Sequence, residues 1–348
     1  MKIYLCLLMS LILMLIGCRK DIQKLVDCNE SSLHQLAGSF NVGVAVEYNK
    51  LLNNEKYRQV VISQFNSITP ENALKHSYIQ PLENAFFWNE ADLLVDFCQK
   101  QNKAFHGHTL IWHKELPDWM ENYNGNWNGM FRNHIITVVS RYKGKIKAWD
   151  VVNEAFEDDG TLRKTIWQKN IGDHYIALAF QYAHEADSEA LLFYNDFDLE
   201  SKPRKMEAVL KMVKDFKAMG IPIHGIGLQM HVSHEYPTNR LIQNSLNCFC
   251  ETGLKIHISE LDVVVNSKEG ADNPTFHLMK EQKKRVKTIV EAYNKLPLEN
   301  KYGISLWGVS DADTWVRKEF NRNDWPLLYD EEYNIKPAYC GFIEGLDQ

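Results

Sequence analysis

Short hydrophobic runs, rich in β-branched and aromatic residues, recur along most of the chain. Each run is six to ten residues long, and more polar segments separate it from the next. Runs of this length and composition are typical of β-strands. We therefore predict eight strands, at residues 40–46, 64–69, 104–112, 146–152, 190–196, 224–232, 254–263 and 303–310.

Longer segments lie between these runs, and in them hydrophobic residues return every three or four positions. This spacing is that of an amphipathic helix with one buried face. Pro203 suits the first turn of such a helix, and Gly220 suits the position just after its end. We predict helices at residues 89–101, 172–186, 203–220 and 276–296.

The regular alternation of strands and helices indicates the fold class. Eight strands that alternate with helices are typical of a single-domain (β/α)8 barrel, which we place at residues 39–348. The alternative is a doubly wound open sheet. No GxGxxG motif follows the first predicted strand, and this disfavours that alternative.

The N-terminal residues follow a different pattern. The apolar run at residues 3–17 is shorter than the roughly 20 residues of a spanning helix and fits a signal-peptide core. It ends in LIGC, which resembles a bacterial lipobox. We predict a lipoprotein signal peptide at residues 1–17, a lipid anchor on Cys18, and a tether at residues 18–38.

On this interpretation the protein is exported, to the periplasmic face or the cell surface. It contacts the membrane only through its lipid. An ordinary cleaved signal or a short anchor helix is the alternative. The net charge of −6 argues against nucleic acid as a partner, because binding to phosphates needs a basic face. We expect a monomer.

The cysteines leave the question of a disulfide open. Without Cys6 in the signal and Cys18 in the anchor, an odd number remains, so at least one thiol is unpaired in the monomer. One disulfide can form in an oxidising compartment, and the sequence does not indicate which pair. The remaining cysteines are Cys28, Cys98, Cys248, Cys250 and Cys340.

Polar and titratable residues gather where the predicted strands end. The C-terminal ends of barrel strands form one shared rim, and active sites of this fold lie there. Glu154 and Glu260 directly follow hydrophobic runs on the fourth and seventh predicted strands. Two such carboxylates can cleave a glycosidic bond, one as acid and the other as nucleophile or base. A separation of about 5–5.5 Å gives retention and about 6.5–9.5 Å gives inversion.

Several motifs carry a family resemblance over residues 40–345. WDVVNEA (149–155) and HISELDV (257–263) resemble the acid/base and nucleophile segments of glycoside hydrolase family 10, the β-1,4-xylanases. The resemblance implies a retaining endo-1,4-β-xylanase that acts on xylan or xylo-oligosaccharides without a metal or cofactor. Further motifs match in order: TPENALK (69–75), HGHTLIWH (106–113), LPDWM (116–120), LFYNDF (192–197), GIGLQMHV (225–232) and LWGVSDADTW (306–315).

The resemblance also implies roles for individual residues. Glu154 resembles the acid/base and Glu260 the nucleophile, which must stay ionised. Asp262 would orient His231, and His231 or Gln229 would donate a hydrogen bond to Glu260. The positions that resemble sugar-binding residues are Glu71, Asn72, Lys75, His108, Trp112, Asn153, Gln229, His231, Trp307 and Trp315.

Three alternatives remain, two from other classes and one among glycosidases of similar type. The first is a metal-dependent hydrolase, with His106, His108, His113 and His231 as ligands. The second is a glycan-binding lipoprotein that has lost catalysis. The third is a retaining β-1,4-glucanase or mannanase on a similar barrel. The sequence also departs from the family at His76, where many relatives have an aromatic residue or proline; this could affect binding of the sugar on the non-reducing side.

Overall fold

The computed structural model describes residues 25–28, 31–268 and 270–347. The predicted signal peptide and Cys18 lie outside these residues. Within the described ranges, no helix has both the length and the apolar character that a membrane crossing requires. Residues 18–24, 29 and 30 of the predicted tether also lie outside them, and its last part forms helix α2 (Leu33–Ala37), which packs beside the barrel.

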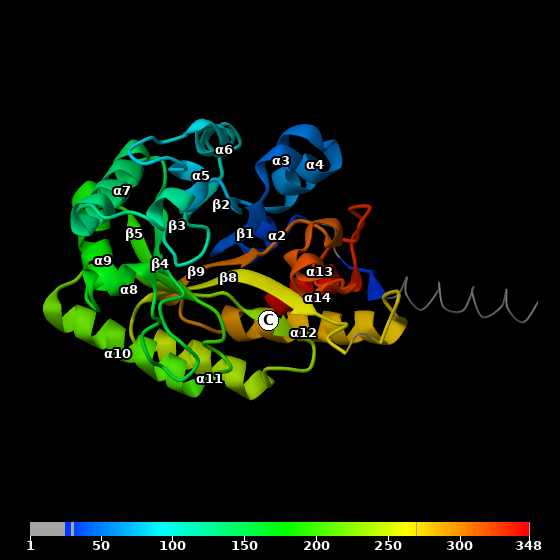
Figure 1. Cartoon of the computed structure of the whole chain (residues 1–348). Helices are drawn as coiled ribbons and strands as arrows, with labels where there is room; N and C mark the ends of the chain where they lie inside the picture. The colour runs from blue at the N-terminus through cyan, green and yellow to red at the C-terminus, as the bar shows by residue number, and fades with distance from the viewer. Residues whose placement is uncertain (1–24, 29–30, 269, 348) are drawn as a thin grey trace, which may run out of the picture.

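Parallel strands form a closed barrel at the centre of the molecule (Figure 1). Each strand pairs with its neighbours in parallel, β1 pairs with β9, and β6 pairs with β8, so that eight strands close the ring. The predicted (β/α)8 fold is confirmed. The strands of the described residues are β1 (Asn41–Val46), β2 (Ser67–Pro70), β3 (Ala104–Ile111), β4 (Ala148–Asn153), β5 (Leu191–Asp196), β6 (Gly225–Leu228), β7 (His231–Ser233), β8 (Lys255–Val264) and β9 (Lys301–Leu306).

The prediction of one continuous strand at residues 224–232 is wrong. β6 ends at Leu228, and the chain turns at Met230, whose φ of 61° lies in the left-handed region. The chain then resumes as β7, which pairs only with the far part of β8, with His231 opposite Asp262. Hydrophobic periodicity could not reveal this break, because Met230 is itself buried.

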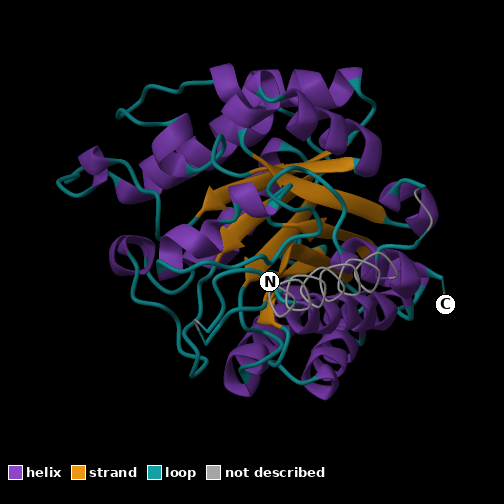
Figure 2. Ribbon diagram, turned by 90° about the vertical axis from the view of Figure 1, so that its right-hand side faces the viewer, coloured by secondary structure: helices purple, strands orange, loops and turns teal. Residues whose placement is uncertain are grey.

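Helices surround the strands (Figure 2). The four predicted helices are present as α6, α9, α10 and α12, and Gly220 caps α10 in a left-handed conformation with a φ of 68°. Other helices were not predicted. The helices after α2 are α3 (Tyr48–Asn53), α4 (Glu55–Gln64), α5 (His76–Ile79), α6 (Asn89–Lys100), α7 (Trp127–Arg141), α8 (Ile166–Ile171), α9 (Tyr175–Ala186), α10 (Pro203–Met219), α11 (Asn239–Cys250), α12 (Phe276–Asn294), α13 (Trp315–Phe320) and α14 (Pro337–Leu346).

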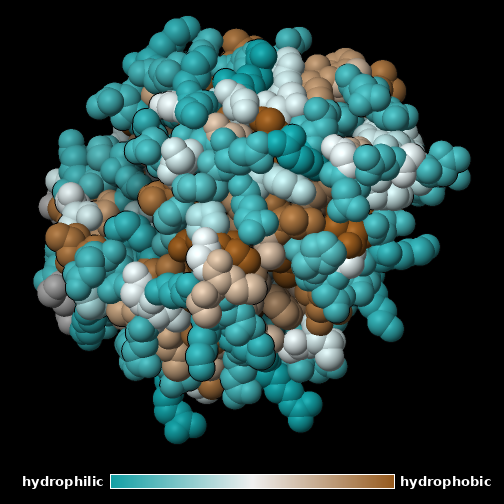
Figure 3. Space-filling view, turned by 90° about the vertical axis from the view of Figure 1, so that its left-hand side faces the viewer, coloured by the Kyte–Doolittle hydropathy of each residue, from teal (hydrophilic) through white to brown (hydrophobic). Residues whose placement is uncertain are grey.

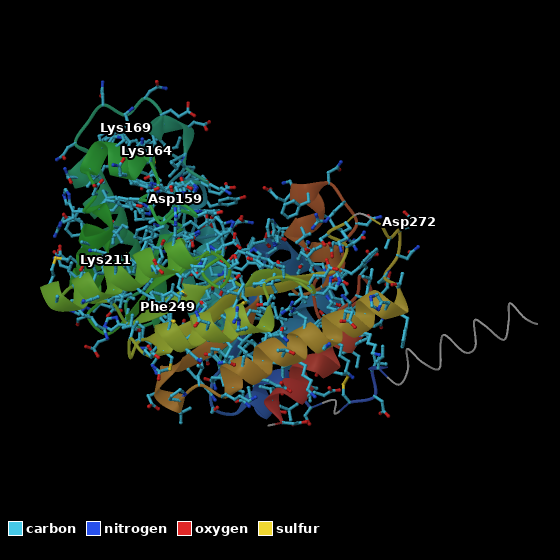
Figure 4. The ribbon with its side chains drawn as sticks, turned by 90° about the horizontal axis from the view of Figure 1, so that it is seen from below. Asp159, Lys164, Lys169, Lys211, Phe249 and Asp272 are labelled. Atoms are coloured by element: carbon cyan, nitrogen blue, oxygen red, sulfur yellow. A yellow bond between two sulfur atoms is a disulfide. The ribbon has the colours of Figure 1, made fainter. Side chains whose placement is uncertain are left out.

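The helices bury one face and expose the other. Lys211 on α10 and Phe249 on α11 illustrate this on the underside of the molecule (Figure 4): the lysine is solvated, whereas the phenylalanine is fully buried. The side on which α7, α9 and α10 lie is mostly hydrophilic, with hydrophobic residues gathered toward its middle (Figure 3). The hydrophobic effect on the inner helix faces and on both faces of the strands therefore holds the barrel together.

A disulfide joins Cys28 to Cys340 on α14. It ties the segment before the barrel to the last helix, across a sequence separation of 312 residues. The sequence left this pairing open. A cross-link over so long a loop removes conformational entropy from the unfolded chain and so stabilises the folded state.

We expect Cys28→Ser to lower the free energy of unfolding by about 2–4 kcal/mol, because the unfolded chain regains the entropy of the open loop. Chemical denaturation under non-reducing conditions measures this change. Cys248→Ser, which removes a partly buried free thiol, is the control and should change stability little. Equal stability of wild type and Cys28→Ser without reductant would contradict the assigned pairing.

A pair of stacked histidines packs between α5 and α7. His76 and His134 are both buried, and their rings lie parallel with centroids 3.8 Å apart. His76 also stacks on Trp167 at 5.7 Å. Burial lowers the pKa of His134 to about 4 and holds the pKa of His76 well below its usual range. Both rings are therefore neutral in the folded protein at neutral pH.

This pair predicts a loss of stability in acid. Between pH 6.5 and 4 the unfolded chain protonates both histidines while the folded chain does not, so stability falls as the pH falls. The lowered pKa of His134 alone should reduce the free energy of unfolding by about 3 kcal/mol between neutral pH and pH 4. The measurement is urea unfolding at several pH values. His76→Phe, which keeps a stacked ring but cannot titrate, should show a shallower pH dependence; an unchanged slope would contradict the assignment.

Candidate active site

Glu154 and Glu260 both lie at the C-terminal end of the barrel. Glu154 directly follows β4, and its N–H donates to the carbonyl of Asn195 on β5 at 2.9 Å. Glu260 lies on β8 just beyond the part that pairs with β6, and its N–H donates to the carbonyl of Gln229 at 3.0 Å. The two residues are only 7% and 4% exposed. The strands thus bring both carboxylates to one end of the barrel, out of bulk water.

Side-chain amides connect the two carboxylates. The Asn195 amide donates to Glu260 Oε1 at 2.7 Å and to Asn153 Oδ1 at 2.9 Å. Asn153 in turn donates to Glu154 Oε1 at 3.3 Å. The Gln229 amide donates to Glu154 Oε1 at 3.2 Å and to Asn153 Oδ1 at 3.3 Å. One continuous set of hydrogen bonds therefore spans both glutamates.

Asn195 is the central member of this set, and the sequence-based site did not include it. The hydroxyl of Ser259 donates to Asn195 Oδ1 at 2.6 Å, so the amide nitrogen must face the carboxylate. Its position at a strand end and within the LFYNDF motif was a usable signal. Asparagine at a strand end is common, however, and only the neighbouring strands show what its two amide protons contact.

His231 lies between Glu260 and Asp262. Its Nε2 is 3.1 Å from Glu260 Oε2, and its Nδ1 is 2.9 Å from Asp262 Oδ2. Burial alone would lower the pKa of His231, but Asp262 and Glu260 outweigh burial and hold it well above its usual range. The ring is therefore an imidazolium at neutral pH and donates to both carboxylates. The predicted contact between Asp262 and His231 is present. The side-chain amide of Gln229 donates its hydrogen bond to Glu154 and not to Glu260.

Two tryptophans border this carboxylate pair. The Trp315 indole donates to Asp262 Oδ2 at 2.7 Å, and its ring centroid is 4.9 Å from that of His231. Trp307 is half-buried and meets His231 edge to face at 6.3 Å. Both rings thus keep part of their surface free beside the nucleophile candidate, as sugar-stacking residues require.

A second group of predicted residues follows β2. Lys75 donates to Asn72 Oδ1 at 2.9 Å, and its ammonium lies 5.2 Å from the Trp112 ring centroid. Burial lowers the pKa of Lys75, and nearby carboxylates, Glu71 first and then others including Glu260 and Glu154, oppose this shift. Burial likewise raises the pKa of Glu71, against the effect of Lys75. This group is therefore electrostatically linked to the two glutamates.

His108 is a buried residue of the site. Its Nδ1 is 2.8 Å from Asp150 Oδ2, and its ring is 5.3 Å from Trp307. The other carboxylate oxygen of Asp150 lies 2.9 Å from His106 Nε2. Burial alone would raise the pKa of Asp150, but His106 and His108 outweigh it and hold it well below the usual range. The site therefore rests on an ionised carboxylate that orients two histidines.

Three of the four histidines proposed as metal ligands have carboxylate partners. His106 and His108 bind Asp150, and His231 binds Glu260 and Asp262. Burial lowers the pKa of His113 to about 4. In the part of the chain that the structure describes, no group of three or more His, Cys, Asp or Glu side chains is arranged to hold a metal ion.

Loops of different strands flank the site. Asp159 lies in the loop after β4 and Asp272 in the loop after β8, and they are far apart across the molecule (Figure 4). Glu154, at the end of β4, and Glu260, on β8, reach the same end of the barrel from two different strands. This arrangement can act on a bond placed between them from two directions, as hydrolysis of an acetal requires.

The sequence matches a known family along nearly its whole length. The model of Glycosyl hydrolase family 10 matches residues 32–344. The chain is 37% identical to an endo-1,4-beta-xylanase of Geobacillus stearothermophilus, over 87% of this chain and 94% of that protein. It is 38% identical to endo-1,4-beta-xylanase A of a Caldicellulosiruptor strain, over 92% of this chain but only 48% of the relative, so it spans about half the length of that protein.

Solved structures agree with this assignment. A variant of xylanase 10C from Cellvibrio japonicus in complex with xylopentaose superposes with a TM-score of 0.87 at 37% identity, over 91% of this chain and 69% of that one. A structure described as GH10 from Paenibacillus barcinonensis gives a TM-score of 0.86 at 34% identity, over 91% and 97% of the two chains. The chain belongs to glycosyl hydrolase family 10.

Proposed function

We propose that this protein is an endo-1,4-β-xylanase that hydrolyses β-1,4-xylosidic bonds of xylan or xylo-oligosaccharides with retention of configuration. The observation that carries the proposal is the difference between the two carboxylates. Glu260 accepts hydrogen bonds from Asn195 and the His231 imidazolium, whereas Glu154 accepts from the neutral amides of Gln229 and Asn153. The names of the relatives, several of which are xylanases, support the substrate class.

In the first step Glu260 acts as the nucleophile. The His231 imidazolium and the amide of Asn195 both donate hydrogen bonds to its carboxylate and hold it in place for attack. An oxygen of Glu260 attacks the anomeric carbon while Glu154 gives its proton to the leaving glycosidic oxygen. The glycosidic bond breaks, the reducing-end fragment departs as an alcohol, and a covalent glycosyl ester of Glu260 remains.

In the second step Glu154 acts as the base. Esterification removes the negative charge of Glu260, so this charge no longer repels the carboxylate that Glu154 now carries. Glu154 takes a proton from water, the water oxygen attacks the anomeric carbon, and the ester bond to Glu260 breaks. Two displacements at the same carbon restore the original configuration.

The remaining residues bind and orient the sugar. We assign Asn153 to the 2-hydroxyl of the reacting xylose, because its amide lies between the two carboxylates. Trp307 and Trp315 stack on sugar rings. We assign the remaining residues to contacts with sugar hydroxyls: Glu71, Asn72, Lys75, His108, Trp112, Gln229 and His231.

Product analysis tests this function. Purified protein is incubated with glucuronoxylan, arabinoxylan, cellulose and mannan, and NMR follows the anomer first released. We expect xylo-oligosaccharides released as the β-anomer. Release from cellulose or mannan instead would favour the glucanase or mannanase, and binding without turnover would favour the glycan-binding protein. First release of the α-anomer would overturn the retaining mechanism.

We also propose that the protein is exported and anchored by lipid on Cys18. The lipobox-like LIGC supports this, and so does the disulfide between Cys28 and Cys340, since disulfides persist in oxidising compartments. The test is expression in a bacterial host with radiolabelled palmitate. Wild type should incorporate label and partition to membranes, and Cys18→Ala should do neither; a labelled Cys18→Ala protein would contradict the anchor.

A further inference from the structure

The backbone of Glu154 has an unusual conformation. Its φ of 57° lies in the left-handed region, which residues with a side chain seldom adopt. Such a conformation persists only where the surrounding structure determines it. Because the direction of a side chain follows from its backbone, whatever holds this conformation also sets where the Glu154 carboxyl points.

Three hydrogen bonds hold the two peptide groups that flank Glu154. The Glu154 N–H donates to the carbonyl of Asn195 at 2.9 Å. Arg163 Nε donates to the Glu154 carbonyl at 3.1 Å. The N–H of Ala155 donates to the hydroxyl of Tyr194 at 2.9 Å. The last of these is a side-chain contact from the neighbouring strand β5, and Tyr194 is fully buried.

The hydroxyl of Tyr194 is itself fixed by an ion pair. It donates its proton to Asp196 Oδ2, while the other oxygen of Asp196 lies 2.6 Å from Lys205 Nζ and accepts from the Phe197 N–H at 2.9 Å. Asp196 and Lys205 are both completely buried. With its proton committed to Asp196, the phenol oxygen presents a lone pair to Ala155.

A buried ion pair is an expensive way to stabilise a fold, because both ions lose their hydration. Well-packed hydrophobic residues of similar size often stabilise as much. The pair of Asp196 and Lys205 therefore calls for a role other than stability. The pair reaches toward the active site through Tyr194, whose hydroxyl contacts both Asp196 and the peptide that follows Glu154.

We propose that Tyr194, oriented by Asp196 and Lys205, is a positioning residue for the proposed acid/base Glu154. It acts through the Ala155 peptide and touches no substrate. The inference rests on the proposed function, since it concerns the delivery of the Glu154 proton. Small misplacements of a catalytic group are costly, and about 1 Å can reduce a rate on the order of 100-fold.

This role makes a selective prediction. Losing the Tyr194 hydroxyl should slow only reactions that need a proton from Glu154. We expect Tyr194→Phe to lower kcat/KM for phenyl β-xylobioside, whose leaving group needs protonation, by roughly 10- to 100-fold. kcat/KM for 2,4-dinitrophenyl β-xylobioside, whose leaving group needs none, should change by less than about threefold.

Tyr293→Phe is the matched control. Tyr293 is also fully buried, its hydroxyl also accepts from a backbone N–H, that of Tyr302 at 2.9 Å, and it donates to the Ile256 carbonyl at 2.8 Å. It belongs to α12, away from Glu154. Tyr293→Phe should lower thermal stability as Tyr194→Phe does, yet leave the ratio of the two kcat/KM values unchanged.

The outcomes separate the inference from the proposed function. If Glu154→Ala discriminates between the two aryl substrates but Tyr194→Phe matches Tyr293→Phe, the positioning role is overturned and the function stands. If Glu154→Ala does not discriminate, or wild type cleaves neither substrate, the proposed function fails. If Tyr194→Phe is too unstable to assay, Lys205→Met offers a second variant, because it removes the ion that orients Asp196; an unchanged ratio there also overturns the role.

Discussion

Glu260→Ala is expected to lose at least about 10⁴-fold in kcat on every substrate, including activated aryl xylosides, because no covalent intermediate can form without the nucleophile. The loss should not depend on the leaving group, since the carboxylate attacks the anomeric carbon whatever departs from it. Steady-state assays on xylan and on dinitrophenyl β-xylobioside measure the loss in kcat and show whether it depends on the leaving group. Substantial turnover of the aryl substrate by this variant would contradict the nucleophile assignment.

The same variant gives a readout that does not need activity. Glu260 and Asp262 together hold the pKa of His231 well above its usual range, so removing one carboxylate should lower it. NMR titration of the His231 ring measures this shift. Asp272→Ala, in the exposed loop after β8, is the control and should change neither the titration of His231 nor the turnover.

Glu154→Ala is expected to lose about 10²- to 10⁴-fold on xylan, because the leaving sugar oxygen then departs without a proton. The first step on a dinitrophenyl glycoside needs no acid and should be nearly as fast as in wild type. Single-turnover measurement of dinitrophenol release isolates that step from the second one, which needs Glu154 as base. A burst followed by slow turnover is the expected record.

Asp159→Ala provides the control for this result. Asp159 belongs to the same loop as Glu154 and is exposed. Within the described residues, the hydrogen bonds of its side chain go only to Thr161. The kcat of the Asp159→Ala variant on both substrates should stay within about twofold of wild type, because surface substitutions usually have small effects. Equal losses by Glu154→Ala on aryl and natural substrates in single turnover would contradict the acid role.

Local properties of the sequence determined much of the fold. The eight barrel strands could be predicted because each parallel strand is buried on both faces and reads as a hydrophobic run. Pro203 and Gly220 marked the ends of α10 because proline lacks an N–H and glycine tolerates the left-handed cap. The position of Glu154 directly after such a run placed it at the barrel rim for the same reason.

The tertiary structure alone decided what depends on contacts between distant segments. Asn195 joins Glu260, 65 residues away, because the order of strands brings them together. The break at Met230 and the pairing of Cys28 with Cys340 have the same origin. The charge of His231 depends on two carboxylates about 30 residues further on. Sequence sets which groups can ionise or donate a hydrogen bond, but distance and burial set their energies, and these arise only when the barrel closes.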